Sequence, residues 1–354
     1  MVFRALSIFL VLAAHGFQFT KPHDRASWWL LAIAKNGTIG VSIFFVISGF
    51  LITSLLMREE RKNGKISLRG FYFRRAFRIF PAFPAYVLFI AVMAGTGHIR
   101  VPASQFAWAL SFAQDYNLHS NWFFVHLWSL SVEEQFYLLW PLLVLLCSKR
   151  VLIWIACTVI VCEPIIRLAT RHFLPSTYGQ IHYMGHTRAD LLMFGCLAAS
   201  VYENQTIGRW LRKSFHPLLP AVLLTFLTVI SPVLQRWSED NYLTLCGYTL
   251  QGVSITLLLW YAIENPQAPM IRWMNRPFAT HIGVLSYSIY LWQQFFFAPP
   301  YAGLLHLAVP VGWAVLAAHV SYYVIERPFL RLRQTLERRE PRELAGAGPE
   351  LSLE

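Results

Sequence analysis

The chain has 354 residues, of which 56% are hydrophobic and only 14% are charged, and its mean hydropathy is +0.45. A soluble domain carries about 25% charged residues, so this composition excludes a pair of soluble domains and indicates a polytopic membrane protein. The net charge of +12 is spread over short stretches between apolar runs. That distribution predicts no nucleic-acid partner and favours phosphate-bearing small molecules and membrane lipid headgroups.

Ten apolar segments follow one another along the chain, and each is long enough for a tilted transmembrane helix. We therefore predict an all-α, polytopic membrane protein with about ten transmembrane helices. If the N-terminus is cytoplasmic, 21 of the 30 Lys and Arg residues fall in inner segments and seven in outer loops, so both termini are predicted to be cytoplasmic. The segments are approximately 2–20, 38–57, 79–97, 128–147, 150–168, 187–203, 216–234, 241–262, 279–298 and 303–325.

The first segment, MVFRALSIFLVLAAHGFQFT, carries Arg4 and His15 within an apolar run. Eleven residues at about 100° each return to the same helix face, so the two side chains are predicted to be co-facial and about 16 Å apart. An ionisable group near mid-bilayer normally faces a protein interior or a wet cavity. Two simpler interpretations are that Arg4 only orients the helix, or that the segment is a signal peptide, which the later apolar runs disfavour.

The loop 98–127 is the longest outer connection and is rich in aromatic residues. It is either a segment lying at the membrane interface or a platform on which an extracytoplasmic sugar stacks. From residue 333 the chain becomes polar. We predict a transmembrane domain over 1–332 and a disordered cytoplasmic tail over 333–354.

The stretch FYFRRAFRIFP, residues 71–81, contains Arg74, Arg75 and Arg78. Arg75 and Arg78 are three residues apart and so lie on one helix face at the inner mouth of the third segment. Topology alone explains positive charge here, but lysine would serve equally. Three arginines favour bidentate contacts with phosphate groups, such as those of an acyl-CoA that enters from the cytoplasm.

The densest polar cluster is HLWSLSVEEQFYLLWP, residues 126–141. Helical spacing places four of its polar residues near one face, and Glu134 about 100° away from them. Glu134 lies three residues after Ser131, a capping-box spacing. Three roles stay open for the neighbouring glutamate: orienting a histidine, accepting a proton, or pairing with an arginine such as Arg188. The four residues of the shared face are His126, Ser129, Glu133 and Tyr137.

Three further motifs contain polar residues within apolar runs. In the second segment, Ser48 and its neighbouring glycine favour close helix packing. In HTRADLLMFG, Arg188 and Asp190 are about 200° apart on a helix, which predicts a capping role for Asp190 and a cavity-facing Arg188. In LSYSIYLWQQ, Tyr287 and Tyr290 suit an aromatic belt at the membrane interface.

Taken together and in order, these motifs resemble the membrane-bound acyltransferase-3 family, which contains bacterial O-acetyltransferases that modify surface polysaccharides and lipid-linked sugars. The resemblance implies about ten helices in the bacterial inner membrane, a cytoplasmic acyl-CoA donor and an acceptor hydroxyl at or beyond the outer side. It also implies a base role for His15, and it relates Glu133 to the glutamate of the family's WSLxxE motif. The residues that the resemblance links to donor binding or function are Arg4, Arg75 and Arg78.

Two departures from the family pattern bear on these roles. Relatives often have a histidine at the position of Gln293, which cannot titrate, so a proton-transfer role is not carried over to it. Relatives also have several residues before the arginine that matches Arg4, whereas here only three precede it, which raises the expectation of a start upstream of Met1.

Two function classes follow. In the first, an O-acyltransferase moves an acyl group, most simply acetyl, from acyl-CoA to a hydroxyl of a carbohydrate or glycolipid. His15 activates the hydroxyl or carries the acyl group transiently, Glu133 supports the imidazole, and the arginines hold the CoA phosphates. In the second, a transporter or flippase uses the same intramembrane polar residues as a substrate path. Neither a permanently bound cofactor nor a metal is predicted, and the cysteines form no CxxC pair and have no metal-site spacing.

Overall fold

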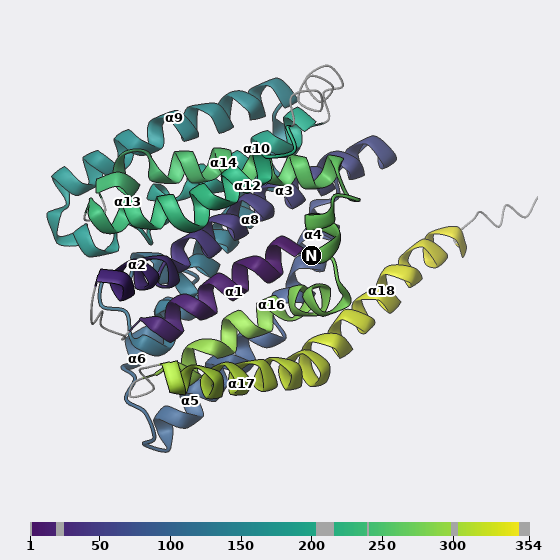
Figure 1. The fold of residues 1–354 in the computed structure, drawn as a ribbon. Coiled ribbons are helices and arrows are strands. Elements are labelled where there is room, and N and C mark those ends of the chain that lie inside the picture. The colour runs from purple at the N-terminus through teal and green to yellow at the C-terminus, as the bar shows by residue number, and fades with distance from the viewer. Residues whose placement is uncertain (1, 19–24, 203–215, 239–240, 299–303, 347–354) are drawn as a thin grey trace, which may run out of the picture.

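A computed structural model describes residues 2–18, 25–202, 216–238, 241–298 and 304–346, and every regular element in these ranges is helical (Figure 1). The predicted all-α class is confirmed for this part of the chain. Short 3₁₀ helices and π-helical stretches connect or extend the α-helices in these ranges. The 3₁₀ helices are η1 (Gln114–Tyr116), η2 (Pro175–Gln180) and η3 (Gly185–Thr187). The π-helical stretches are η4 (Phe226–Ile230), η5 (Leu243–Gly247) and η6 (Ser321–Glu326). The α-helices are α1 (Val2–Phe17), α2 (Arg25–Ala34), α3 (Gly37–Asn63), α4 (Leu68–Ile79), α5 (Ala82–Gly95), α6 (Ala103–Leu110), α7 (Trp122–Val125), α8 (Leu127–Leu146), α9 (Lys149–Phe173), α10 (Ala189–Tyr202), α12 (Leu219–Thr225), α13 (Ser231–Trp237), α14 (Tyr248–Glu264), α15 (Pro269–Met274), α16 (Pro277–Phe296), α17 (Leu304–Val320) and α18 (Arg327–Gly346).

Each of the ten predicted apolar segments contains a helix of this structure. Among the described residues, seven helical stretches are long and apolar enough to cross a membrane, and α1 and the helix α10 are apolar but shorter. The described part of the chain is therefore all-helical, and the protein is a multi-pass membrane protein. Ten crossings and cytoplasmic termini stay predictions, since length and composition do not fix the position of the bilayer.

Helix α1 packs against α2, α3, α16 and α17 on one side, while Phe9 on its other side is 66% exposed. Its N-terminus lies beside α4, and α2 and α6 lie at the opposite end of the molecule (Figure 1). We call these two ends the α4 end and the α2 end. A helix that links both ends can present the polar residues of its packed face to two separate sites.

Small residues let the central helices approach closely. A Cβ atom added to Gly40 of α3 would lie 2.6 Å from the backbone oxygen of Ser7 of α1, and Ser7 Oγ donates to the Gly40 carbonyl at 2.5 Å. Between α3 and α10, a Cβ atom on Gly49 or on Gly195 would lie 2.1 Å from a backbone oxygen of the other helix. The packing role predicted for the Ser48 region is therefore confirmed at Gly49, where α3 approaches α10, and Gly40 gives α3 a similar close approach to α1.

Helix α4 carries the arginine cluster and is separate from α5. Ser67 caps its start by accepting a hydrogen bond from the amide of Gly70 at 3.1 Å. Pro81 lacks an amide hydrogen and so interrupts the hydrogen bonding between the helices, since α4 ends at Ile79 and α5 begins at Ala82. The arginines consequently lie on a short helix that precedes the third apolar segment.

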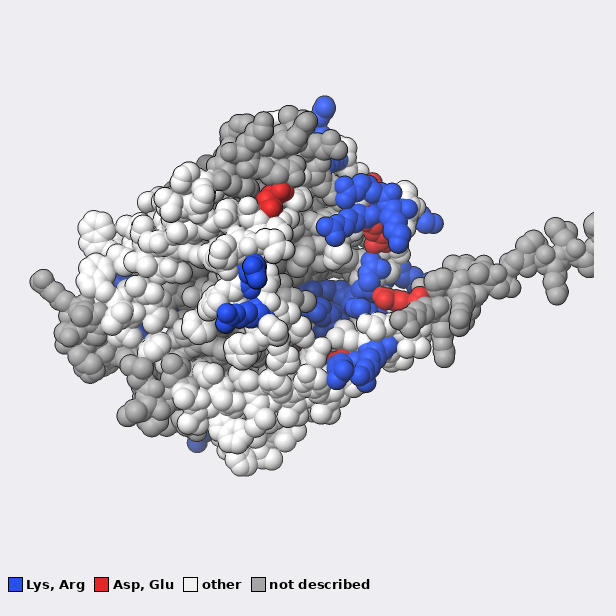
Figure 2. Space-filling model, turned by 45° about the vertical axis from the view of Figure 1, so that its right-hand side comes forward, with Lys and Arg blue, Asp and Glu red and all other residues white. Residues whose placement is uncertain are grey.

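Basic side chains gather on the side of the molecule from which α18 projects (Figure 2). Helix α18 continues to Gly346, so helical structure extends past residue 333, where the predicted tail begins. Residues 347–354 lie outside the described residues, and the division of the chain at residue 332 stays a prediction. Exposed basic residues near the α4 end include Arg58, Arg61, Lys62, Lys65, Arg69, Arg272, Arg276, Arg327 and Arg331.

Candidate active site

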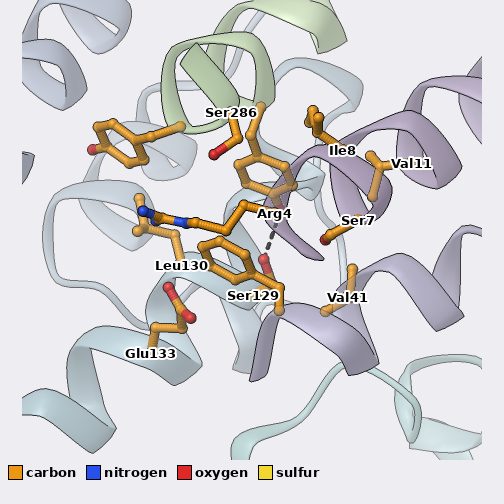
Figure 3. A pocket seen from close by; sticks show the side chains of 12 residues that line it. Arg4, Ser7, Ile8, Val11, Val41, Ser129, Leu130, Glu133 and Ser286 are labelled. Atoms are coloured by element: carbon orange, nitrogen blue, oxygen red, sulfur yellow. Dashed lines mark hydrogen bonds between the residues drawn. The ribbon is translucent and has the colours of Figure 1, made fainter. Parts of the chain in front are cut away.

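A small pocket of about 30 Å³ lies between α1, α3, α8 and α16 (Figure 3). Arg4 extends from α1 across this pocket, and the Glu133 carboxylate from α8 faces the same space. Arg4 also interacts electrostatically with Glu133 and with Arg75 and Arg78 of α4. We call this site the inner pocket, because it lies toward the α4 end.

Glu133 is held by a hydroxyl group and faces a guanidinium group. Ser48 Oγ donates to Glu133 Oε1 at 2.5 Å, and Arg75 Nη2 lies 3.9 Å from Glu133 Oε2. The same nitrogen of Arg75 lies 3.2 Å from Glu134 Oε1, and its guanidinium carbon lies 3.6 Å from the centre of the Tyr137 ring. Because a buried carboxylate is costly without partners, this arrangement stabilises both charges at the pocket wall.

The predicted capping box of Ser131 and Glu134 is wrong. Helix α8 begins at Leu127, so Ser131 lies in its second turn instead of at its start. Ser131 Oγ donates to the Leu127 carbonyl and accepts from the amide of Gln114. Glu134 is thus available to pair with Arg75.

The three arginines of α4 occupy different environments. Arg75 and Arg78 are close to the inner pocket, and Arg78 also interacts electrostatically with Glu326 of η6, whose side chain is buried. Arg74 is 42% exposed and pairs with Glu59 of α3 at 2.8 Å. The structure therefore brings two of the three predicted arginines to the site and leaves Arg74 at the surface.

A larger cavity of about 310 Å³ lies toward the α2 end of α1, and we call it the outer cavity. Trp122 from the aromatic loop 98–127 forms part of its wall, and Trp122 Nε1 donates to the carbonyl oxygen of Gln294 at 2.9 Å. The loop thus contributes to a cavity, as its platform interpretation requires. The side chains that line the outer cavity include His15, His126, Gln294, Trp122, Trp128 and Tyr183.

The His15 imidazole is oriented by an amide. His15 Nδ1 lies 2.8 Å from Oε1 of Gln293, a fully buried residue of α16. An amide oxygen only accepts hydrogen bonds, so this contact places the proton on Nδ1 and leaves the Nε2 lone pair free to take a proton. Glu133, which was expected to support the imidazole, instead contacts Ser48 and Arg75. The sequence analysis considered only proton transfer at Gln293 and so missed this role. An amide can orient the His15 imidazole without itself being titratable.

Tyr290 separates the two sites. Its side chain lines both the inner pocket and the outer cavity, as do Val11 and Val41. Its hydroxyl donates to the carbonyl of His126, and it accepts from Ser129 Oγ, which lies 2.6 Å away. The aromatic-belt prediction is wrong for Tyr290, and also for Tyr287, whose buried ring lines the inner pocket.

Arg188 is fully buried among aromatic rings. Its guanidinium carbon lies 3.9 Å from the centre of the Tyr248 ring, and 5.7 Å and 5.6 Å from those of Phe45 and Trp128. Arg188 does not line either of the sites described above. The prediction that Arg188 pairs with Glu133 is therefore wrong. The guanidinium of Arg188 is stabilised by cation–π contacts.

Asp190 forms a buried ion pair instead of serving mainly as a cap. Its Oδ2 lies 2.9 Å from Arg167 Nη1, and both side chains are fully buried. Its Oδ1 accepts from the amide of Leu191, a local contact at the start of α10. Arg167 lies within α9, which extends to Phe173.

Comparison with known proteins identifies the family. A family model described as an acyltransferase domain, of the acyltransferase-3 type, matches residues 2–325. The chain belongs to this acyltransferase family. The resemblance inferred from the ordered motifs is thereby confirmed, and the matched range contains both the inner pocket and the outer cavity.

Curated relatives of this family member carry O-acetyltransferase names. The chain is 27% identical over 353 residues to the peptidoglycan O-acetyltransferase OatA of Listeria monocytogenes, covering 92% of this chain and 53% of that protein. It is 26% identical over 345 residues to the O-acetyltransferase OatA of Staphylococcus aureus, covering 86% of this chain and 54% of that one. The chain thus spans about half the length of these relatives. No solved structure matches the chain.

Proposed function

We propose that this protein is an integral-membrane O-acyltransferase of the bacterial inner membrane. It moves an acyl group, with acetyl as the first candidate, from cytoplasmic acyl-CoA to a hydroxyl of a sugar, polysaccharide or glycolipid at the outer side. Family membership and the names of the relatives support an O-acyl transfer reaction. The surface basic residues near the α4 end support entry of an anionic donor from that side.

The observation that carries the proposal is the arrangement of two sites along α1. The inner pocket presents Arg4, and the outer cavity presents the free Nε2 of His15. Tyr290 lies on the wall that the two sites share. A donor that enters from the α4 end and an acceptor that enters from the α2 end would therefore meet near this wall.

The reaction requires a base and a good leaving group, and His15 supplies the base. Nε2 of His15 takes the proton of the acceptor hydroxyl while its oxygen attacks the thioester carbonyl. The resulting tetrahedral intermediate collapses, the carbon–sulfur bond breaks and CoA leaves as a thiolate. The thiolate then receives the proton from the imidazolium, so the products are the acyl ester and CoA with a free thiol. Gln293 keeps the ring oriented throughout by accepting the Nδ1 hydrogen bond.

The arginines near the inner pocket hold the donor. Arg4, Arg75 and Arg78 interact electrostatically with one another, and guanidinium groups bind phosphate oxygens through paired hydrogen bonds. Glu133 and Glu134 keep Arg75 in place between substrate-binding events. This assigns Glu133 to the donor side of the site rather than to the His15 imidazole.

Direct transfer and an acyl-His15 intermediate differ in what accumulates. We propose direct transfer, because the Nε2 that would carry the acyl group is also the atom that must accept the hydroxyl proton. Rapid-quench labelling with radioactive acetyl-CoA tests this choice. The appearance of a labelled protein species before any product would refute direct transfer and favour covalent catalysis.

The decisive experiment measures acetyl-CoA turnover by the purified protein in lipid vesicles, with His15→Ala as the control. Release of CoA together with acetylation of an added carbohydrate supports the proposal if the His15→Ala variant lacks both. The alternative is a transporter or flippase of an acylated or lipid-linked substrate. Substrate movement across the vesicle membrane without release of CoA in the wild type would establish that alternative.

A further inference from the structure

Two polar side chains in the outer cavity have unused hydrogen-bonding groups. The side chain of His126 is 3% exposed and that of Gln294 is fully buried, and both line the cavity with His15. Neither ring nitrogen of His126 has a hydrogen-bond partner at standard geometry among the described residues, and the same is true of Gln294 Nε2. Buried polar groups are almost always paired, and within the described chain only a loose contact with the Leu291 backbone reaches the His126 ring, so a further partner would satisfy these groups.

The surroundings of His126 hold its ring without using its nitrogens. The ring lies edge-on to Tyr86, with centroids 5.5 Å apart, and 5.4 Å from the Tyr290 ring. The hydroxyls of both tyrosines are used elsewhere, since Tyr86 donates to the carbonyl of Phe123 and Tyr290 donates to the backbone carbonyl of His126 itself. The imidazole is thus held by aromatic contacts and a loose backbone contact with Leu291, which leaves hydrogen-bonding capacity on the ring for a ligand.

Gln294 is oriented by its neighbour. Gln293 Nε2 donates to Gln294 Oε1 at 3.4 Å, so the amide oxygen of Gln294 is used and its NH₂ group is left over. The same Gln293 accepts the hydrogen bond from His15. A short chain of contacts therefore connects the imidazole of His15 to an unpaired amide donor in the same cavity.

We propose that His126 and Gln294 bind the acceptor by hydrogen-bonding to oxygen atoms that neighbour the hydroxyl activated by His15. His126 and His15 are close enough to interact electrostatically, so a single ligand in the cavity can reach both. A ligand that satisfies these groups carries several adjacent hydroxyl or carbonyl oxygens, as a sugar ring does, and Trp122 and Trp128 supply apolar surface for its faces. This inference rests on the proposed acyl transfer and concerns only the acceptor.

The test uses the purified full chain in vesicles, with acetyl-CoA as donor and chitotetraose as the probe acceptor. His126→Phe keeps an aromatic ring without polar atoms, and Gln294→Leu keeps the approximate size of the side chain without the amide. Each variant is expected to lower kcat/KM for chitotetraose about tenfold, the effect of one lost neutral hydrogen bond, with KM for acetyl-CoA within about twofold of wild type. His126→Gln, which restores polar atoms, is expected to lose less than His126→Phe. His98→Phe, at an exposed histidine outside the cavity, serves as the matched control.

The outcomes separate this inference from the proposed function. If the wild type releases CoA and acetylates chitotetraose but both variants keep the wild-type kcat/KM for the acceptor, the role of His126 and Gln294 is refuted and acyl transfer stands. Equal losses in kcat/KM for the acceptor and for acetyl-CoA would indicate that these residues have a structural role, and would also refute their role in binding the acceptor. A wild type with no CoA release on any carbohydrate would instead overturn the proposed function.

A measurement on the wild type decides the matter if the apolar variants do not fold. The ¹⁵N chemical shifts of histidine ring nitrogens report their hydrogen bonding, so they are measured on ¹⁵N-histidine-labelled wild type in vesicles, with His126→Gln used to assign the His126 signals. Chitotetraose is expected to shift the His126 ring signals and to leave those of the exposed His98 unchanged, because a bound ligand hydrogen-bonds to the His126 ring. Unchanged His126 signals at saturating chitotetraose would overturn the proposal.

Discussion

The inner pocket and the outer cavity share the helix α1 but are built from different kinds of polar group. In the inner pocket region, guanidinium groups face carboxylates, as in the contact of 3.2 Å between Arg75 and Glu134. In the outer cavity an imidazole faces an amide, as in the contact of 2.8 Å between His15 and Gln293. Charged pairs suit the binding of an anionic donor, whereas a neutral amide partner leaves the imidazole able to accept a proton, although Lys35 also lines the outer cavity. The difference indicates that donor binding and proton transfer are assigned to opposite ends of one helix.

The largest expected effect comes from removing the His15 imidazole. Without its base, the His15→Ala variant is expected to lose about 10³-fold in the rate of acetyl transfer, within the range of a general base in enzymes. Because His15 lies in the outer cavity, the Kd for acetyl-CoA should stay within about twofold of wild type. Radiolabelled transfer and calorimetric titration measure the two quantities. A comparable loss of acetyl-CoA binding would contradict the separation of the two sites.

Removing an arginine of the inner pocket region is expected to give the next largest effect. This effect is on the binding of the acyl donor. Arg75→Ala should raise the Kd for acetyl-CoA about 30-fold, the value of a charge-assisted contact, and leave KM for the acceptor unchanged. Arg75→Lys keeps the charge that faces Glu133 and Glu134 and distinguishes loss of binding from loss of folding. Arg74→Ala is the matched control, because Arg74 is exposed and pairs with Glu59. Equal effects at Arg74 and Arg75 would show that only overall surface charge matters.

Adjacent glutamines offer a smaller and more specific contrast within the outer cavity. Gln293→Leu removes the acceptor that fixes the His15 tautomer, so kcat should fall about tenfold with little change in either KM. Gln294→Leu should instead raise KM for the acceptor, as argued above. Steady-state kinetics on the two variants, which differ by one position, measure the contrast. If both variants changed the same parameter, orientation of His15 and binding of the acceptor would not be separate tasks.

Much of the architecture could be predicted from the sequence, because its cause is local. Apolar runs and helical spacing were sufficient to place helices in all ten segments and to place Arg4 and His15 on the interior side of α1. The ordered motifs were sufficient to identify the family. Each of these inferences depends on residues that are neighbours along the chain or repeat with the helical period.

Contacts between distant segments could not be predicted in the same way. Gln293 reaches His15 across 278 positions of the chain, and Arg75, not Arg188, faces Glu133. These pairings depend on which helices pack together, and helical spacing along one segment carries no such information. Tyr290 shows the same limit, since an aromatic residue near a helix end suits an interface belt and a cavity wall equally well.

The smallest expected effect is on thermal stability and comes from Asp115 of η1, a carboxylate at the α2 end. Unlike Glu134, which pairs with an arginine, Asp115 has neutral partners. Asp115 is buried, and among the described residues its carboxylate accepts from neutral donors, Gln135 Nε2 at 3.0 Å and the amide of Gly185 at 3.1 Å. Burial raises the pKa of Asp115 to about 6, and the two hydrogen bonds limit the rise. The folded protein therefore holds this proton more tightly than the unfolded chain, in which the pKa of aspartate is about 3.9.

This raised pKa fixes the sign of a pH effect on stability. Between pH of about 4 and about 6 the folded state binds more protons than the unfolded state, so the contribution of Asp115 to the free energy of unfolding falls as pH rises and is constant above that window. Relative to Asp115→Asn, which has no such titration, the wild type should lose about 2 °C in Tm between pH 5 and pH 7.5. Thermal unfolding of both proteins in the same detergent measures the difference and cancels the titration of all other groups. If the Tm values of the two proteins changed in parallel, the neutral donors around Asp115 would be sufficient to stabilise its charge. Carboxylates with neutral partners and carboxylates paired with arginine would then not differ in how they affect stability.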